Sequence, residues 1–131
     1  MQTIPNDFRD LLDSPVAILS TVGPTGRPQQ SVIWFLAEDG TVRISLNSTR
    51  QKAHNLSKNP ACSLVIVDPK STQRYLEVRG RAEVEDDPSY TFAQKVGAKY
   101  GADLRAFDEP GSTRVVVTVP NERVRTVDLR G

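Results

Sequence analysis

The chain has 131 residues, of which 37% are hydrophobic and 25% are charged, and its formal net charge at pH 7 is +1. This length predicts one domain, residues 1–131, with a hydrophobic core of its own. The small net charge argues against a general nucleic-acid-binding protein, and the single cysteine excludes an intrachain disulfide and a zinc–cysteine cluster.

The ends and apolar runs of the chain bear on its location. The N-terminal residues lack the basic-then-apolar pattern of a signal peptide, and no apolar run approaches the length of a membrane-spanning helix. We therefore expect a cytoplasmic protein with no membrane partner.

The first third of the chain predicts a short helix followed by strands. An amphipathic helix is expected over residues 5–13, then strands over 16–23 and 29–38, separated by a turn rich in Gly and Pro. The Asp-Gly pair at 39–40 predicts a hairpin turn into a third strand at 41–47, where apolar and polar residues alternate.

The rest of the chain predicts two helices and further strands. A helix is expected over 49–58, a buried strand over 61–68, a strand over 74–86, a helix over 88–101, and one long or two short strands over 113–129. Gly80 indicates a bulge or a close approach of another backbone segment. Six strands joined mainly by hairpins predict an antiparallel barrel, which the pattern alone does not separate from a sandwich or an OB-fold.

The helix predicted at 49–58 has an unusual charge pattern. Ser48 and Gln51 have the spacing of a capping box, and an Asn-Pro pair marks the end of the helix. Its first turn carries Arg50 and Lys52, although the free N–H groups there favour acidic side chains. Together with the Thr49 hydroxyl, these cations are suited to a phosphate group. A solvent-exposed basic helix face is the alternative reading.

Other chemistry has little support in the sequence. His54 is the only histidine and is expected on the helix surface, so neither a catalytic dyad nor a metal site is predicted. The acidic residues 85–87 are expected to form a solvated strand end.

Three motifs, in this order, resemble the pyridoxamine-phosphate-oxidase-like split β-barrels, in particular their mycobacterial-type deazaflavin (coenzyme F420)-dependent branch. They are GRPQ leading into a strand with the aromatic pair Trp34-Phe35, the pattern T-R-x-K-x-x-N-L-x-x-N-P from Thr49 to Pro60, and V-x-G-x-A from Val78 to Ala82. The resemblance extends from about residue 8 to 128.

This resemblance implies a mainly β protein with short helices, namely a six-stranded antiparallel split β-barrel that forms a homodimer with a site at the subunit interface. Arg50 and Lys52 would hold the cofactor phosphate with help from Thr49. Strand residues would flank the tricyclic ring, and alternation along a strand lets only every second side chain face it. The flanking candidates are Gln30, Ser31, Val32, Ile33, Trp34, Ser45, Leu46 and Asn47. Whichever of Trp34 and Phe35 points inward would belong to the core.

The implied activity is hydride transfer from reduced coenzyme F420 to an electron-poor conjugated small molecule such as an enone, lactone, quinone or tetrapyrrole. The alternatives are an FMN-binding oxidoreductase on the same fold and a non-enzymatic protein that binds the cofactor or haem. F420 is favoured over FMN because its oligoglutamate tail would suit further cations expected near the site, which are Arg43, Lys58, Lys70 and Arg74. Vitamin B6 oxidation is not expected, because the C-terminus lacks the Arg-x-His-type element of the true oxidases.

Overall fold

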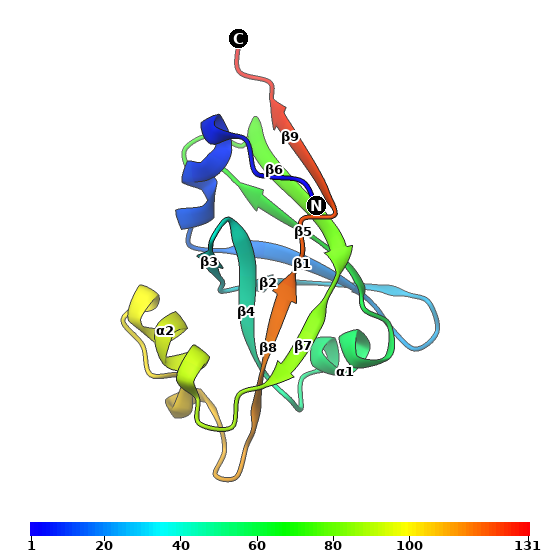
Figure 1. The fold of residues 1–131 in the computed structure, drawn as a ribbon, viewed down its shortest axis with the longest axis vertical. Coiled ribbons are helices and arrows are strands. Elements are labelled where there is room, and N and C mark those ends of the chain that lie inside the picture. The colour runs from blue at the N-terminus through cyan, green and yellow to red at the C-terminus, as the bar shows by residue number, and fades with distance from the viewer.

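The computed structural model describes all of residues 1–131 as two antiparallel sheets with short helices around them (Figure 1). The five-stranded sheet has the order β2-β1-β5-β6-β9 and the four-stranded sheet the order β3-β4-β8-β7. The strands of the first sheet are β1 (Ala17–Val22), β2 (Pro28–Ile33), β5 (Ala61–Val67), β6 (Arg74–Arg81) and β9 (Arg123–Asp128). Those of the second are β3 (Leu36–Glu38), β4 (Thr41–Asn47), β7 (Glu83–Asp86) and β8 (Arg114–Val119).

The structure thus has nine strands where six were predicted, because three of the predicted strands each divide between the two sheets. The segment 29–38 breaks after β2, where Tyr100 Oη accepts a hydrogen bond from Phe35 N and donates one to Phe35 O, so that a side chain replaces a ladder partner. The segment 113–129 breaks after β8 at Pro120, which has no N–H to give to a ladder.

The third division, between β6 and β7, lies beside Gly80. A Cβ atom on this glycine would stand 2.2 Å from the carbonyl oxygen of Pro120. The predicted close approach of another backbone segment at Gly80 is therefore confirmed.

The main core lies between the two sheets and contains 20 buried residues. On β4 the side chains of Val42, Ile44 and Leu46 all point into it, as the alternation predicted. Phe35 is completely buried, whereas its neighbour Trp34 is partly exposed. Of the aromatic pair, Phe35 is the core residue.

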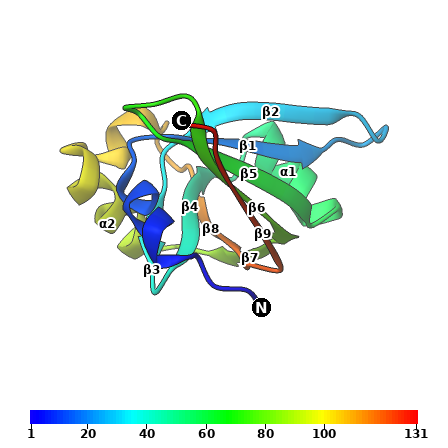
Figure 2. The ribbon, with the colours of Figure 1, turned by 90° about the horizontal axis from the view of Figure 1, so that it is seen from above.

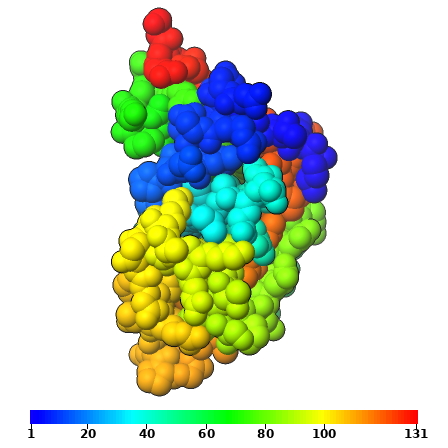
Figure 3. Space-filling model, turned by 60° about the vertical axis from the view of Figure 1, so that its left-hand side comes forward, coloured from blue at the N-terminus to red at the C-terminus, as the bar shows by residue number.

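Four short helices surround the sheets: η1 (Asn6–Asp13) and η2 (Leu104–Phe107), both of the 3-10 type, and α1 (Gln51–Lys58) and α2 (Thr91–Tyr100). Helix α2 and the segment after it form a continuous part of the surface, yellow to orange in Figure 3, beneath the N-terminal segment in blue. A second cluster of six buried residues joins α2 and η2 to β8. None of the helices is long and apolar enough to cross a membrane.

Helix α2 begins at Thr91, three residues after the predicted start at Pro88. The carboxylate of Asp87 accepts hydrogen bonds from the backbone N–H groups of Phe92 and Ala93, at 3.3 and 3.0 Å. Asp87 is buried, so the prediction that the whole acidic segment 85–87 is solvated was wrong at this residue. The physical reason is that free N–H groups at a helix start attract a carboxylate.

Candidate functional site

The start of α1 differs from the predicted capping box. The helix begins at Gln51, and no side chain caps it. The Ser48 hydroxyl instead lies 3.0 Å from the carbonyl oxygen of Thr113. The side-chain oxygen of Asn47 accepts hydrogen bonds from the backbone N–H and the hydroxyl of Thr49, at 3.0 and 2.7 Å. The residues before the helix are thus held by a local turn, and no side chain of the protein takes the capping position.

Lys52 is buried although it is charged. Its exposed fraction is 8%, and no hydrogen bond or ion pair within the chain satisfies its ammonium group. Burial lowers the pKa of Lys52, and the neighbouring charge of Arg50 lowers it further. A buried charge is normally paired, because removing it from water costs free energy. Two neighbouring cations without acidic partners therefore favour an anion at this position.

Asn55 explains why α1 presents these cations where it does. Its amide nitrogen donates to Thr21 Oγ1 at 3.0 Å and to Gln29 Oε1 at 2.9 Å, and its amide oxygen accepts from Gln51 Nε2 at 2.8 Å. These contacts attach α1 to the β1–β2 hairpin, which projects to the right in Figure 2. No role was predicted for Asn55, although it is part of the Thr49–Pro60 pattern.

Two adjoining cavities, of about 340 and 330 Å³, lie beside these cations. They share six lining residues and so form one trough, which we call the α1 trough. The shared residues are Ser45, Leu46, Arg50, Lys52, Phe107 and Arg114. Its polar end adds Asn47 and Thr49, among others, and its apolar end adds Val32, Ile33 and Trp34, among others.

The apolar end of the trough is built around an aromatic group. The rings of Trp34 and Tyr100 are stacked with their centroids 4.2 Å apart, and Phe107 meets Trp34 edge-on at 6.1 Å. Stacked and edge-on aromatic rings at these separations attract one another. An exposed planar surface with a cationic end suits a flat ring system that carries a phosphate.

Nine of the eleven residues expected to bind the cofactor line the α1 trough, and two do not. Gln30 lies on β2, exposed on the same face as Val32 but beyond the trough. Ser31 also lies outside the trough, on the face of β2 opposite to Val32. The trough brings the others together, and their role in binding stays a prediction.

The four cations expected near the site do not gather there. Arg74 is buried beneath η1, where it donates to Asp10 at 2.6 Å and to Asp68 at 3.1 Å, and Lys70 lines the same separate cavity. Arg43 is paired with Glu38 at 2.7 Å. Lys58 has no acidic partner and lies in the last turn of α1, the helix whose first turns carry Arg50 and Lys52. The prediction that these four cations gather near the site and suit an oligoglutamate tail was therefore wrong, because three of them are paired with carboxylates or lie elsewhere.

A buried ion pair in the wall of the trough was not predicted from the sequence. Arg114 donates to both carboxylate oxygens of Asp108, at 2.8 and 3.0 Å, and Asp108 also accepts from Asn47 and from the Tyr90 hydroxyl. Arg114 above all lowers the pKa of Asp108, to about 2. No motif indicates the pair, since a lone Asp in a loop and a lone Arg at a strand start are common surface residues.

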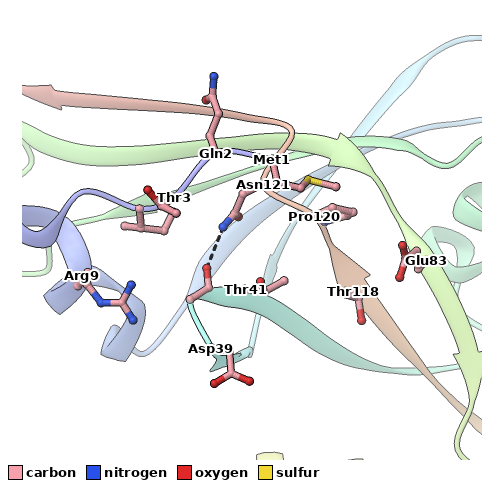
Figure 4. Close-up of a pocket in the computed structure, with 12 residues that line it drawn as sticks. Met1, Gln2, Thr3, Arg9, Asp39, Thr41, Glu83, Thr118, Pro120 and Asn121 are labelled. Atoms are coloured by element: carbon pink, nitrogen blue, oxygen red, sulfur yellow. Dashed lines mark hydrogen bonds between the residues drawn. The ribbon is translucent and has the colours of Figure 1, made fainter.

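A cavity of about 270 Å³ lies away from the trough, between the N-terminal segment, the β3–β4 turn and the end of β8 (Figure 4). Its lining combines Arg9 with the acidic Asp39 and Glu83, and Asn121 donates to the carbonyl oxygen of Gly40 at 2.9 Å. None of the predicted site residues lines it. Its mixture of charges gives it no excess positive charge, so the α1 trough is the better candidate for an anion.

Comparison with known proteins identifies the family. The family described as pyridoxamine 5'-phosphate oxidase matches residues 4–128, and the chain therefore belongs to this family of split-barrel proteins. A solved structure of an F420 reductase from a mycobacterium is 33% identical, with a TM-score of 0.80 over 93% of this chain and 98% of that one.

More distant structures share the fold. The conserved hypothetical protein Rv2991 from Mycobacterium tuberculosis is 24% identical, with a TM-score of 0.77 over 99% of this chain and 88% of that one. The haem storage protein HutZ from Vibrio cholerae is 16% identical, with a TM-score of 0.76 over 99% and 100% of the two chains. The comparison with curated proteins gave no significant match.

Proposed function

We propose that the protein is an oxidoreductase that transfers hydride from reduced coenzyme F420 to an electron-poor conjugated small molecule, such as an enone, lactone, quinone or tetrapyrrole. The observation that carries this proposal is the buried side chain of Lys52, which lines a trough with an aromatic opposite end and whose ammonium group has no partner in the chain. Membership of the family and the similarity to an F420 reductase support it.

The residues of the trough fit such a cofactor. Lys52 and Arg50 would hold its phosphate through charge-assisted hydrogen bonds, and the Thr49 hydroxyl would join them by exchanging its hydrogen bond to Asn47 for one to the phosphate. Val32, Trp34 and the other apolar residues would lie against its ring and exclude water. When bound, the deazaflavin supplies the hydride, so the task of the chain is to bind and orient.

The lining of the trough contains no His, Cys or Tyr, and its Asp108 carboxylate is paired with Arg114. Tyr90 does not line the trough, and its hydroxyl is hydrogen-bonded to Asp108 at 2.7 Å, a contact that raises the pKa of Tyr90. We therefore propose that solvent or a bound water protonates the reduced product.

FMN is the alternative cofactor, because it shares the ribityl phosphate and the trough offers no second group of cations that would favour the F420 tail. Haem binding, the other alternative, has less support. His54 is exposed on α1 and lines neither part of the trough.

We also propose that the protein is a homodimer whose partner completes the site. The apolar end of the trough is open, and beside it lies an exposed pair of cross-strand residues, Ile18 on β1 and Val32 on the edge strand β2. Val32 is 67% exposed. A second copy covering this edge would bury these side chains and close the trough.

The experiment that tests the proposed function is native mass spectrometry of the protein with F420 and FMN in parallel, followed by an activity assay. We expect F420 to bind, and reduced F420 to reduce a quinone or activated alkene in the presence of the protein with little oxygen consumption. Binding of neither compound would refute the proposal. Oxidation of pyridoxamine phosphate with FMN and oxygen would replace it with the activity of the true oxidases.

A further inference from the structure

One buried carboxylate connects both ends of the α1 trough. The side chain of Asp108 is 4% exposed and accepts four hydrogen bonds from three side chains. One of these donors, Asn47, holds the Thr49 turn at the polar end. Another, Arg114, also donates to the carbonyl oxygen and the hydroxyl of Ser45 on β4, at 3.3 and 3.2 Å.

The residue before Asp108 forms part of the apolar end. Phe107 is 65% exposed, lines both parts of the trough and touches Trp34 with its edge. An aromatic side chain this exposed is not held in place by core packing. Its position depends on the backbone, which Asp108 fixes to Arg114 and Tyr90 immediately after it.

From this geometry we infer that Asp108 is a positioning residue: it holds Phe107 against the ring end of the trough while it fixes Asn47 and Arg114 at the phosphate end. The inference rests on the proposed function, since it assigns Asp108 and Phe107 to the binding of the cofactor ring. It also accounts for Arg114, whose charge is neutralised by Asp108 and so leaves Lys52 and Arg50 as the cations available to an anion.

Asp108→Asn tests the inference, with Asp103→Asn as the matched control. Asp103 lies in the same segment and accepts a hydrogen bond from Arg105 N, but it does not line the trough. The probes are F420 and the same deazaflavin with its ribityl chain unphosphorylated. We expect Asp108→Asn to weaken the unphosphorylated compound, which has only the ring end to lose, by about 2- to 12-fold, which is the range of one aromatic contact, and to weaken F420 by at least that factor because the phosphate end is disturbed as well. Asp103→Asn should bind both as the wild type does, whereas a variant of Lys52 should weaken only the phosphorylated compound.

A second measurement needs no ligand. Trp34 is the only tryptophan, so its fluorescence reports on the ring end of the trough. Asp108→Asn should make Trp34 more accessible to acrylamide, while Asp103→Asn leaves it unchanged. Unchanged quenching in folded Asp108→Asn would overturn the inference, even if the wild type bound neither probe and the proposed function had failed.

Phe107→Ala keeps the test valid if Asp108→Asn does not fold. Phe107 is exposed and its removal leaves the ion pair intact, so this variant should fold. We expect it to weaken both probes equally and to increase the quenching of Trp34. Wild-type affinity for both probes in Phe107→Ala would overturn the inference.

Discussion

Lys52 carries a charge where the chain itself does not compensate it. A lysine in such surroundings is less stable charged than in water, and its lowered pKa expresses this cost. Most of the Lys52 side chain is nevertheless buried in the free protein. A bound phosphate would remove the cost, so the same side chain destabilises the free protein and stabilises the complex.

Lys52→Met should therefore raise the melting temperature of the free protein while weakening F420 binding. Methionine keeps most of the buried stem, and the lost charge-assisted hydrogen bond is worth about 1.5–3 kcal/mol, or about 10- to 150-fold in affinity. Fluorescence titration and thermal melts without cofactor measure the two effects. Lys58→Met, in the exposed last turn of the same helix, is the control and should change both little. If Lys52→Met bound F420 normally, the proposed phosphate site would be refuted, and the cations of α1 would form only a solvent-exposed basic face.

The Asp108–Arg114 pair predicts a pH dependence of stability. The pKa of Asp108 is about 2 in the folded protein and 3.8 for an unperturbed side chain. Its contribution is thus fully present above about pH 4 and is lost as the pH falls through 2. Urea midpoints of the wild type and Asp108→Asn should differ at neutral pH, and the difference should shrink below about pH 3. An equal difference at both pH values would contradict the assigned pKa.

Among the structural elements, β6 and the end of β8 approach so closely that position 80 requires glycine. In Gly80→Ala the new methyl group would overlap the Pro120 carbonyl, and this backbone atom cannot move aside as a side chain would. We expect a loss of about 1–3 kcal/mol in unfolding free energy, measured by urea denaturation. Arg79→Ala, on the same strand but with an exposed side chain, should cost less than about 1 kcal/mol. A tolerated Gly80→Ala would mean that the two strands can separate at no cost.

Features that depend on local patterns could be predicted from the sequence. The alternation in 41–47 gave the buried face of β4, and the Asn-Pro pair gave the end of α1. The strand breaks could not be predicted, because the Tyr100 hydroxyl that replaces the ladder at Phe35 lies 65 residues away. The same holds for the site: the motif contained Arg50 and Lys52, whereas Asp108 and Arg114 reach it only through the fold.

For the whole molecule, the exposed edge of the five-stranded sheet predicts self-association. Sedimentation at micromolar concentration should give about twice the chain mass of 14.5 kDa. Ile18→Glu would place a charge in the proposed interface and should produce a monomer with weaker cofactor binding. Val84→Glu is the matched control, because Val84 is similarly exposed but lies on β7 in the other sheet. A wild-type monomer with full cofactor affinity would refute the shared site.

Three segments of the chain each supply a strand to both sheets, and this affects how the protein comes apart. Because each of these segments belongs to both sheets, unfolding of one sheet disrupts the other. We therefore expect the two sheets to unfold together. Amide hydrogens in the middle of β5 and of β8 should therefore exchange with solvent through the same global opening, with equal free energies. Two sheets that look like independent layers would then behave as one cooperative unit.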